Sequence, residues 1–170
     1  MRRRQLSPPV RPARPARGQL RFVRGKRRVR ILTRIINIET TARLELRDLT
    51  EQIRDALNPG QVKEGFVHLM TLHTTIGLFV NEWQSALTDD MRNFLQRLVD
   101  DADEFAHNLP ENGECDRQNA AAHLRAMVLG NSLSLPIKGG KLALGKWQRI
   151  IMAELDGPQE RSLQLQVIGQ

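Results

Sequence analysis

The sequence predicts one α+β domain, built mostly from antiparallel strands with about three helices. Apolar residues alternate with a period of two in several short stretches before and after the middle of the chain. Helical periodicity is confined to three short segments, and Gly, Pro and Asn separate the predicted elements. The resulting order is strands, one helix, strands, two helices and a closing run of strands, which is typical of α+β proteins.

The first half of the body is expected to contain four strands and one helix. Alternating and β-branched residues predict strands at residues 29–38, 42–46, 65–72 and 76–81. We expect the first two of these strands to pair with each other. Either Asp48 or Thr50 can cap a helix over residues 51–57, because both side chains can accept a hydrogen bond from a free N–H of the first turn. An Asn-Pro-Gly turn then ends this helix.

The second half begins with two predicted helices that are joined by an acidic loop. Residues 89–99 place their apolar side chains on one helical face. Residues 101–117 form the loop, which is long for a compact domain, and long ordered loops are often functional. Residues 119–129 form the next helix, capped by Asn119 and closed by Gly130. Turn signals then predict successive hairpin strands at residues 132–137, 141–144, 147–154 and 161–168.

Charge is distributed unevenly along the chain. Residues 1–30 contain twelve Lys and Arg and no Asp or Glu, whereas residues 31–170 contain fourteen basic against nineteen acidic residues. Like charges repel, and prolines remove backbone donors, so residues 1–28 are expected to be a disordered Arg/Pro-rich tail. Such a tail could make nonspecific, salt-sensitive contacts with polyanions. Residues 29–170 are expected to form the single folded domain.

Composition restricts the class of protein further. The chain has 170 residues and 40% hydrophobic residues, which suits one soluble domain with a sizeable core. No apolar run reaches the roughly eighteen residues of a membrane span. The single cysteine, Cys115, excludes an intramolecular disulfide and is expected to be inert. A cytoplasmic location is therefore expected.

Three of the four histidines fall within fifty-one consecutive positions and carry polar neighbours. The segments are His73-Thr74-Thr75, Asn81-Glu82, His107-Asn108 and Asn119-Ala120-Ala121-Ala122-His123. Histidine can change its charge near neutral pH and is the commonest metal ligand. The grouping therefore predicts a polar site that folding assembles, whereas His68, inside an apolar strand, is expected to be structural.

The residue types in these segments suit a metal or acid–base centre. We expect His73, His107 and His123 to converge on one pocket, as catalytic residues or as ligands of a divalent metal, zinc or magnesium, that leave a coordination position open. Glu82 could be a fourth ligand or a base, and Asn81 and Asn119 could orient the bound groups. No nucleotide-binding, zinc-protease or serine-hydrolase motif is present. A hairpin turn explains the phosphate-like Lys-Gly-Gly-Lys segment at residues 138–141.

Read together, these segments resemble the YjbQ-like family, commonly labelled secondary thiamine-phosphate synthase. The similar pieces also include LG at 129–130, LALGKWQRI at 142–150 and ELDGP at 154–158, in the family's order over about residues 29–170. The resemblance implies a compact α+β sandwich, a homotrimer, and a polar site at His73, Glu82, His107, Asn119 and His123. It also implies structural roles for Gly145, Trp147, Gln148 and Asp156-Gly157-Pro158. Lys146 and Gln159 depart from the family pattern, where many members have a small hydroxyl residue and Arg.

The sequence therefore leaves three functions open. The first is a small enzyme that resembles secondary thiamine-phosphate synthase and acts on a small-molecule substrate through a His/Glu site. The second is a metal-dependent hydrolase of a small phosphorylated or acyl substrate. The third is a non-catalytic trimer that binds a metal or ligand. Thiamine-phosphate synthesis favours Mg²⁺ on carboxylates with basic groups for pyrophosphate, whereas a histidine-rich set suits a transition metal or acid–base chemistry.

Overall fold

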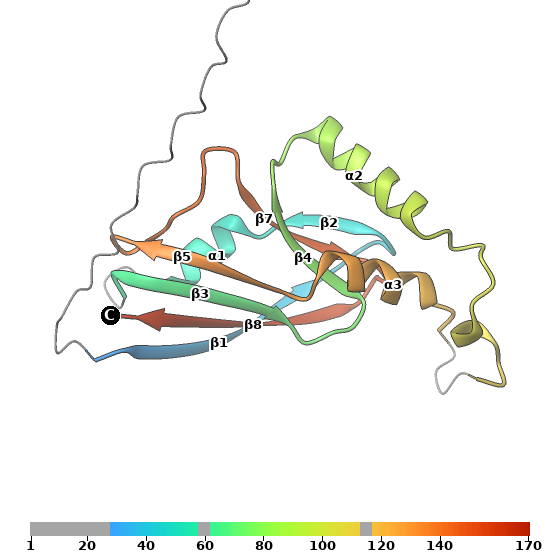
Figure 1. Cartoon of the computed structure of the whole chain (residues 1–170), viewed down its shortest axis with the longest axis horizontal. Helices are drawn as coiled ribbons and strands as arrows, with labels where there is room; N and C mark the ends of the chain where they lie inside the picture. The colour runs from blue at the N-terminus through green and yellow to red at the C-terminus, as the bar shows by residue number, and fades with distance from the viewer. Residues whose placement is uncertain (1–27, 58–61, 113–116) are drawn as a thin grey trace, which may run out of the picture.

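A computed structural model describes residues 28–57, 62–112 and 117–170, and these residues form a sandwich of two antiparallel sheets (Figure 1). The strands are β1 (Arg30–Glu39), β2 (Glu45–Asp48), β3 (Glu64–Thr71), β4 (Ile76–Asn81), β5 (Ser132–Lys138), β6 (Lys141–Leu142), β7 (Arg149–Glu154) and β8 (Glu160–Gly169). The helices are α1 (Thr50–Ala56), α2 (Ser85–Leu98) and α3 (Ala120–Leu129), with a short 3-10 helix at Ala106–Asn108. One sheet has the order β1-β8-β3-β5-β6 and the other β2-β7-β4. The predicted α+β sandwich with three α-helices is confirmed.

The main core lies between the two sheets. Strand β7 contributes Ile150 and Met152, and strand β8 contributes Leu163 and Leu165, all of them fully buried. These residues alternate along each strand because successive side chains of a strand point to opposite faces. Alternation therefore puts every second residue of β7 and β8 into the space between the sheets.

A second, smaller core lies on the outer face of the three-stranded sheet. Ile151 and Ala153 of β7 pack there against Leu95 of α2 and Ala122 and Ala126 of α3. Strand β7 is thus buried on both faces, which its nearly continuous apolar sequence permits. Helix α2 covers the sheet through Leu95, whereas α3 does so through the small side chains of Ala122 and Ala126.

The strand pairing corrects two expectations from the sequence. The strand expected at 42–46 begins at Glu45, and it pairs with β7 instead of β1, which pairs with β8. The loop of residues 40–44 carries the chain from one sheet to the other, and this lets Leu46 join the small core. The closing strands are not a simple run of hairpins either, because β7 belongs to the small sheet and β8 inserts between β1 and β3.

Helix α2 also begins earlier than expected, at Ser85. The side-chain oxygen of Gln84 accepts a hydrogen bond from the Leu87 N–H at 2.8 Å and so caps the first turn. Thr88 instead lies within the helix, where its hydroxyl donates to the Ser85 carbonyl at 2.7 Å. Glutamine is an uncommon N-cap, which is why the sequence pointed to the threonine.

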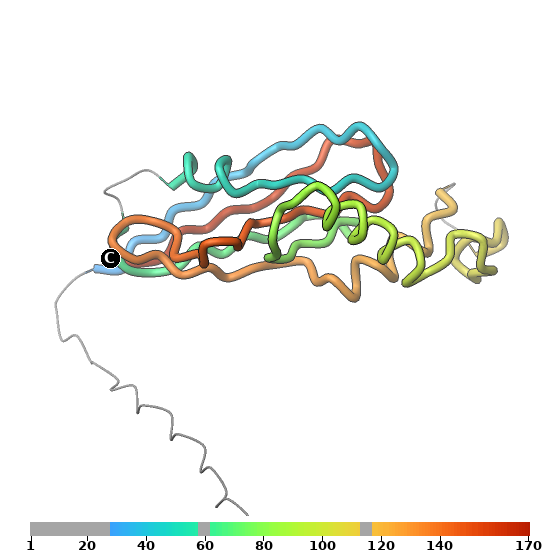
Figure 2. Tube along the Cα trace, turned by 90° about the horizontal axis from the view of Figure 1, so that it is seen from above, coloured from blue at the N-terminus to red at the C-terminus, as the bar shows by residue number. Residues whose placement is uncertain are grey.

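Residues 99–112, which follow α2, project beyond the end of the sheets in both Figure 1 and Figure 2. They carry the short 3-10 helix and therefore place His107 near the start of α3. The basic tail lies outside the described residues except for Arg28. Within the described ranges, no helix is long and apolar enough to cross a membrane.

Candidate functional site

Three segments that are distant in sequence meet at one end of the sandwich, which we call the histidine end. The β3–β4 turn brings His73, and the first turns of α3 bring Asn119 and His123. Strand β7 ends here at Glu154, which pairs with Ile76 at the beginning of β4. The polar residues at this end are therefore carried by the ends of strands and by the start of one helix.

A buried ion pair lies beneath this end. Glu154 has an exposed fraction of 0%, and its two carboxylate oxygens accept hydrogen bonds of 2.6 Å each from Nε and Nη2 of Arg161. The same carboxylate also accepts from the Thr40 hydroxyl at 3.0 Å and from the backbone N–H of Asp156 at 2.8 Å. Arg161 in turn donates to the Thr75 hydroxyl at 3.1 Å. The pair therefore ties together the β1–β2, β3–β4 and β7–β8 connections.

His73 is held as a neutral ring against strand β8. Its Nε2 accepts a hydrogen bond of 2.8 Å from the backbone N–H of Ser162, so this nitrogen carries no proton. Burial lowers the pKa of His73, and the nearby positive charge of Arg161 lowers it further, while Glu154 opposes the change. The ring is therefore a fixed acceptor, with only Nδ1 left for another partner.

His107 is the end of a short hydrogen-bonded chain. The Asp156 carboxylate accepts a hydrogen bond of 2.8 Å from the side-chain nitrogen of Asn119. That contact turns the Asn119 side-chain oxygen toward His107, whose Nε2 lies 3.2 Å away and must be the donor. The Asn119 side chain thus orients His107. It does not cap its own helix, so the N-cap role predicted from the sequence is wrong.

His123 lies directly against His107. The two rings meet edge to face, with centroids 5.2 Å apart and planes at 88°. Burial lowers the pKa of His123 and the neighbouring His107 lowers it further, while Asp156 and a hydrogen bond to the backbone of Thr74 act in the opposite direction. His123 is therefore held largely neutral at pH 7, with one ring nitrogen engaged by the Thr74 carbonyl and the other available.

Two hollows open at His123. One, of about 480 Å³, is lined by His73, Thr74 and His123 together with residues of α3 and the turn that follows it. The other, of about 390 Å³, is lined mainly by Phe105, His107, His123 and Leu124. The three histidines predicted from the sequence are thus brought to one region, and His123 is the ring that both hollows share.

Glu82 and Asn81 are not brought to the histidines within one chain. They lie at the far end of β4, six residues beyond its start, which corresponds to about 20 Å at 3.3 Å per residue. Asn81 pairs there with Arg149, and the Asn81 side chain accepts a hydrogen bond from the Glu82 N–H. Within one chain, β4 runs straight from the histidine end to Asn81 and Glu82 and so keeps these two residues apart from the histidines.

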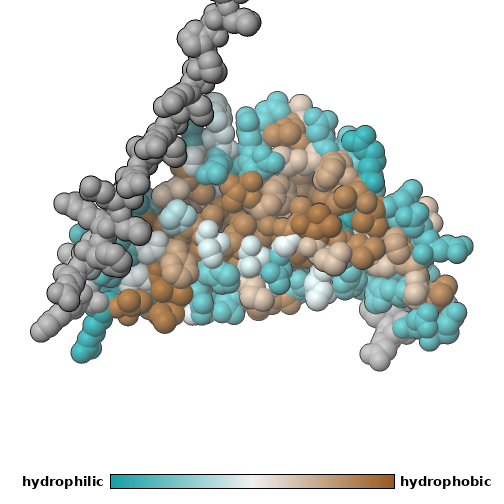
Figure 3. Space-filling model, in the orientation of Figure 1, coloured by the Kyte–Doolittle hydropathy of each residue, from teal (hydrophilic) through white to brown (hydrophobic). Residues whose placement is uncertain are grey.

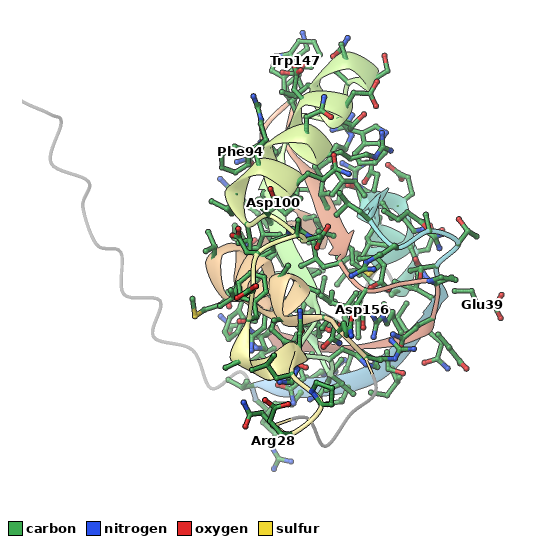
Figure 4. The ribbon with its side chains drawn as sticks, turned by 90° about the vertical axis from the view of Figure 1, so that its right-hand side faces the viewer. Arg28, Glu39, Phe94, Asp100, Trp147 and Asp156 are labelled. Atoms are coloured by element: carbon green, nitrogen blue, oxygen red, sulfur yellow. The ribbon has the colours of Figure 1, made fainter. Side chains whose placement is uncertain are left out.

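Trp147 also lies at this far end and has an exposed fraction of 61%. In Figure 4 it is widely separated from Asp156, which marks the histidine end. Gln148 and Gly145 hold the loop through two mutual hydrogen bonds of 2.7 and 3.0 Å, and the Lys146 ammonium lies 4.6 Å from the indole ring centre. Gly145 and Gln148 therefore shape a turn, whereas the exposed Trp147 side chain is not part of either described hydrophobic core.

The other residues singled out from the sequence lie elsewhere. His68 is on β3, where its Nδ1 is 3.1 Å from the Ser134 hydroxyl, in agreement with a structural role. Gly139 and Gly140 form the β5–β6 turn, both with positive φ, as expected for a hairpin. Cys115 lies outside the described residues.

The described residues at the histidine end provide no ready-made set of metal ligands. Within residues 28–57, 62–112 and 117–170, no group of three His, Cys, Asp or Glu side chains is arranged to hold an ion. His73 accepts a hydrogen bond at Nε2 from the Ser162 N–H, and His107 donates from Nε2 to Asn119, so each ring has one nitrogen engaged by a protein partner.

Comparison with known proteins identifies the family. The model of the family described as UPF0047 protein YjbQ-like matches residues 34–170. The chain belongs to the YjbQ-like UPF0047 family. A UPF0047 protein of Methanothermobacter thermautotrophicus is 34% identical over 139 residues, covering 82% of this chain and 93% of the relative. UPF0047 protein YugU of Bacillus subtilis is 30% identical, covering 81% of this chain and 100% of the relative.

Solved structures of YjbQ-like proteins have the same fold. A YbjQ-like protein of unknown function from Sulfolobus solfataricus superposes with a TM-score of 0.77 at 29% identity and covers 84% of this chain and 100% of its own. A hypothetical protein from Aeropyrum pernix gives 0.75 at 33% identity, covering 82% of this chain and 99% of its own. The resemblance recognised in the sequence is therefore confirmed for family and fold.

Sequence reasoning missed the buried pair of this YjbQ-like domain, although a signal was present. Arg161 shares the inward parity of Leu163 and Leu165, and Glu154 shares that of Ile150 and Met152. A charge at an inward position of a strand needs a partner, because burial of an isolated charge is very costly. Glu154 at the end of one strand and Arg161 near the start of the next therefore both point inward and carry opposite charges. This pattern in the sequence predicts that the two side chains pair.

The lowered histidine pKa values predict a pH-dependent stability. In the unfolded chain the pKa of His73 and His123 is near 6.5, and in the folded protein both are lower. Their contribution to the free energy of unfolding is fully present above pH 6.5. It is lost as the pH falls below 6.5, because the unfolded chain then binds protons before the folded protein does. We expect the melting temperature to fall between pH 7.5 and 5.5, and less steeply in the His123→Gln variant. Calorimetry at both pH values measures this, and parallel curves for the two proteins would contradict it.

Proposed function

We propose that the protein is a small-molecule enzyme that uses the His107–His123 pair for proton transfer, with His123 as the general base. The observation that carries the proposal is the contact of two imidazoles at the junction of two hollows, each ring oriented by a separate protein acceptor. A histidine with a purely structural role needs only one partner. Here Asn119 orients His107, the Thr74 carbonyl orients His123, and the pair still faces two open hollows.

The proposed chemistry follows from the protonation states. A general base must be neutral before it acts, and burial lowers the pKa of His123 so that the neutral ring prevails at pH 7. Its hydrogen bond to the Thr74 carbonyl fixes which nitrogen holds the resting proton, so the other nitrogen accepts the proton of the substrate or of a water. The imidazolium that forms is stabilised by the Asp156 charge, which is among the groups that favour protonation of His123.

His107 has a supporting role in this proposal. Asn119 holds its Nε2–H, and Asp156 holds Asn119, so the ring cannot turn away from His123. An oriented imidazole edge against a base limits the base to one productive orientation, which is a main source of rate enhancement in enzymes. Together the residues form an ordered series from Arg117, through Asp156 and Asn119, to the two histidines.

Thiamine-phosphate synthesis, which the family resemblance implies, is the first reaction to test. Purified full-length protein is incubated with the pyrimidine pyrophosphate, the thiazole phosphate and Mg²⁺, and the product is measured by chromatography. A second reaction class, hydrolysis of a small phosphorylated or acyl substrate by a water activated at His123, is supported by the neutral ring beside open hollows. A metabolite screen by thermal stabilisation covers it, since any ligand of the folded state raises the melting temperature.

Metal content is measured in the same experiment. Elemental analysis of the purified protein tests the divalent ion expected from the sequence. Full turnover by a metal-depleted protein, with Mg²⁺ supplied only with the pyrophosphate substrate, supports the mechanism in which the two histidines bind no metal. Stoichiometric zinc that is required for turnover would contradict that mechanism. If no metabolite class is turned over or bound, the enzyme proposal itself is overturned and a structural role of the histidines remains.

We further propose that the protein assembles as a homotrimer. Apolar side chains gather on the surface over α3 and its surroundings in Figure 3, and Met127 and Val128 of α3 have exposed fractions of 74% and 60%. Exposed apolar patches of this kind mark protein interfaces. Each contact of a cyclic trimer joins two different surfaces, so Glu82 of one subunit can meet the histidines of the next.

Met127→Glu is expected to convert the trimer to monomers, because it places a charge within this apolar surface. Light scattering on the wild type and on the variant at micromolar concentration measures the change in mass. Gln52→Glu, which adds the same charge at an exposed position of α1, is the matched control and should remain trimeric. A wild-type protein that is monomeric and fully active would remove both the trimer and the shared site.

A further inference from the structure

A third hollow, separate from the two at His123, opens at the histidine end and has a volume of about 410 Å³. Three connections form it: the β1–β2 loop, the residues that lead into α3, and the β7–β8 loop. Its lining residues are Arg43, Arg117, Gln118, Asp156, Gly157 and Pro158. Two arginines in a lining of six residues make this the most cationic of the hollows at this end.

The two arginines differ in how they are neutralised. Nη1 of Arg117 donates to the Asp156 carboxylate at 2.9 Å. Nη2 of Arg43 donates only to the backbone carbonyl of Gln118, at 3.3 Å, and no carboxylate in the described part of the chain lies within 4.0 Å of its guanidinium. Among the described lining residues one carboxylate faces two guanidinium groups, which leaves one positive charge and several N–H donors for a ligand.

The walls of this hollow are fixed by the packing beneath it. A Cβ at Gly157 would lie 2.3 Å from the Ala42 carbonyl oxygen and 2.8 Å from Cγ of Glu154, so the β7–β8 loop sits tightly on the β1–β2 loop. The Gly157 N–H donates to the Arg43 carbonyl at 3.1 Å, and the Asp156 N–H donates to buried Glu154. The backbone that carries Arg43 is therefore held in place before any ligand arrives.

We infer that this hollow binds the phosphoryl group of a small-molecule ligand, with Arg43 as the principal contact and Arg117 as the second. Guanidinium groups match phosphate oxygens with paired N–H donors and remain charged at all working pH values. A phosphate group also suits the hollow better than a carboxylate does, because its three terminal oxygens can accept hydrogen bonds from both guanidinium groups at once. Only the statement that this ligand is the substrate rests on the proposed function.

The position of the hollow links the ligand to the histidines. Asp156 lines it and also accepts the hydrogen bond from Asn119 that orients His107. A phosphoryl group anchored at Arg43 and Arg117 would therefore lie on the other side of Asp156 and Asn119 from the histidine pair. The inferred ligand is thus a molecule with a phosphorylated end and a reacting part that can extend past the start of α3.

Inorganic phosphate is the probe for the test. Its binding to the full-length protein is measured by calorimetric titration at constant ionic strength, with acetate and sulfate titrated in parallel. Arg43→Gln removes one cation without exposing a buried partner, and it is expected to weaken phosphate binding about tenfold, as for a lost hydrogen bond to a charged group. Arg43→Lys keeps the charge but loses the fork and should give an intermediate value. Arg54→Gln, from an exposed ion pair on α1, is the control and should bind as the wild type does.

The outcomes separate this inference from the proposed enzyme function. Equal phosphate affinity in the wild type and in Arg43→Gln, or no binding to either protein, would overturn the hollow as a phosphoryl site even if turnover is observed. Acetate that binds as tightly as phosphate would overturn the phosphoryl assignment. Phosphate binding that depends on Arg43 in a protein without turnover would keep this site and remove the histidine chemistry.

Discussion

Replacement of His123 by glutamine is expected to lower kcat by about 10²- to 10⁴-fold, the usual contribution of a positioned general base. Glutamine can still hydrogen-bond to the Thr74 carbonyl and is close in size to histidine, so the fold and the hollows should persist. It cannot take up a proton at neutral pH, and the proton-transfer step is therefore lost. The rate is measured on the substrate found in the turnover assay, with circular dichroism to verify folding.

His68→Gln is the matched control for this substitution. It removes a histidine of the same chain that contacts Ser134 on the sheet surface and lines none of the hollows at the histidine end. The control should keep the wild-type rate. If His123→Gln is as active as this control, His123 is not the base and its pairing with His107 has a structural purpose.

Replacement of Arg161 by methionine is expected to reduce the free energy of unfolding by about 3–5 kcal/mol, the range measured when one partner of a buried ion pair is removed. Glu154 would then remain buried, with an exposed fraction of 0%, without the two guanidinium hydrogen bonds. Its bonds to Thr40 and to the Asp156 N–H compensate only in part. Urea denaturation at pH 7 measures the loss.

Two further variants identify the cause of this loss. The double variant with Glu154→Gln and Arg161→Met removes the unpaired carboxyl group and is expected to recover part of the stability. Arg54→Gln breaks an exposed pair with Glu51 and should change stability by at most about 1 kcal/mol. A loss in Arg161→Met that is no larger than in Arg54→Gln would show that Glu154 finds other compensation.

The fold was predictable from the sequence because local patterns determine most of its elements. Alternation identified β1, β3, β4 and β8 to within a residue or two, since one face of each strand is apolar and the other polar. Pairing was not predictable in the same way: β2 is adjacent to β1 in sequence, yet it belongs to the other sheet. The choice between sheets depends on which core accepts Leu46, and no local pattern contains that information.

The candidate site was predictable in its histidines but not in its partners. Scarce histidines with polar neighbours pointed to His73, His107 and His123, and folding places all three at one end. Glu82 was grouped with them because it is near in sequence, although a straight strand carries it about 20 Å away. The role of Asn119 changed for a related reason, since the sequence shows a helix start but not the Asp156 side chain that reaches it from another loop.

The separation of the two ends of β4 also determines which part of the molecule affects the intrinsic tryptophan fluorescence. The chain has two tryptophans and no tyrosine, so its intrinsic fluorescence comes almost entirely from Trp83 and Trp147. Trp83 follows β4 directly, Trp147 lies in the loop before β7, and both indoles are at least one-third exposed. The emission spectrum therefore senses whether a neighbouring molecule covers the end of the sandwich opposite the histidines of the same chain.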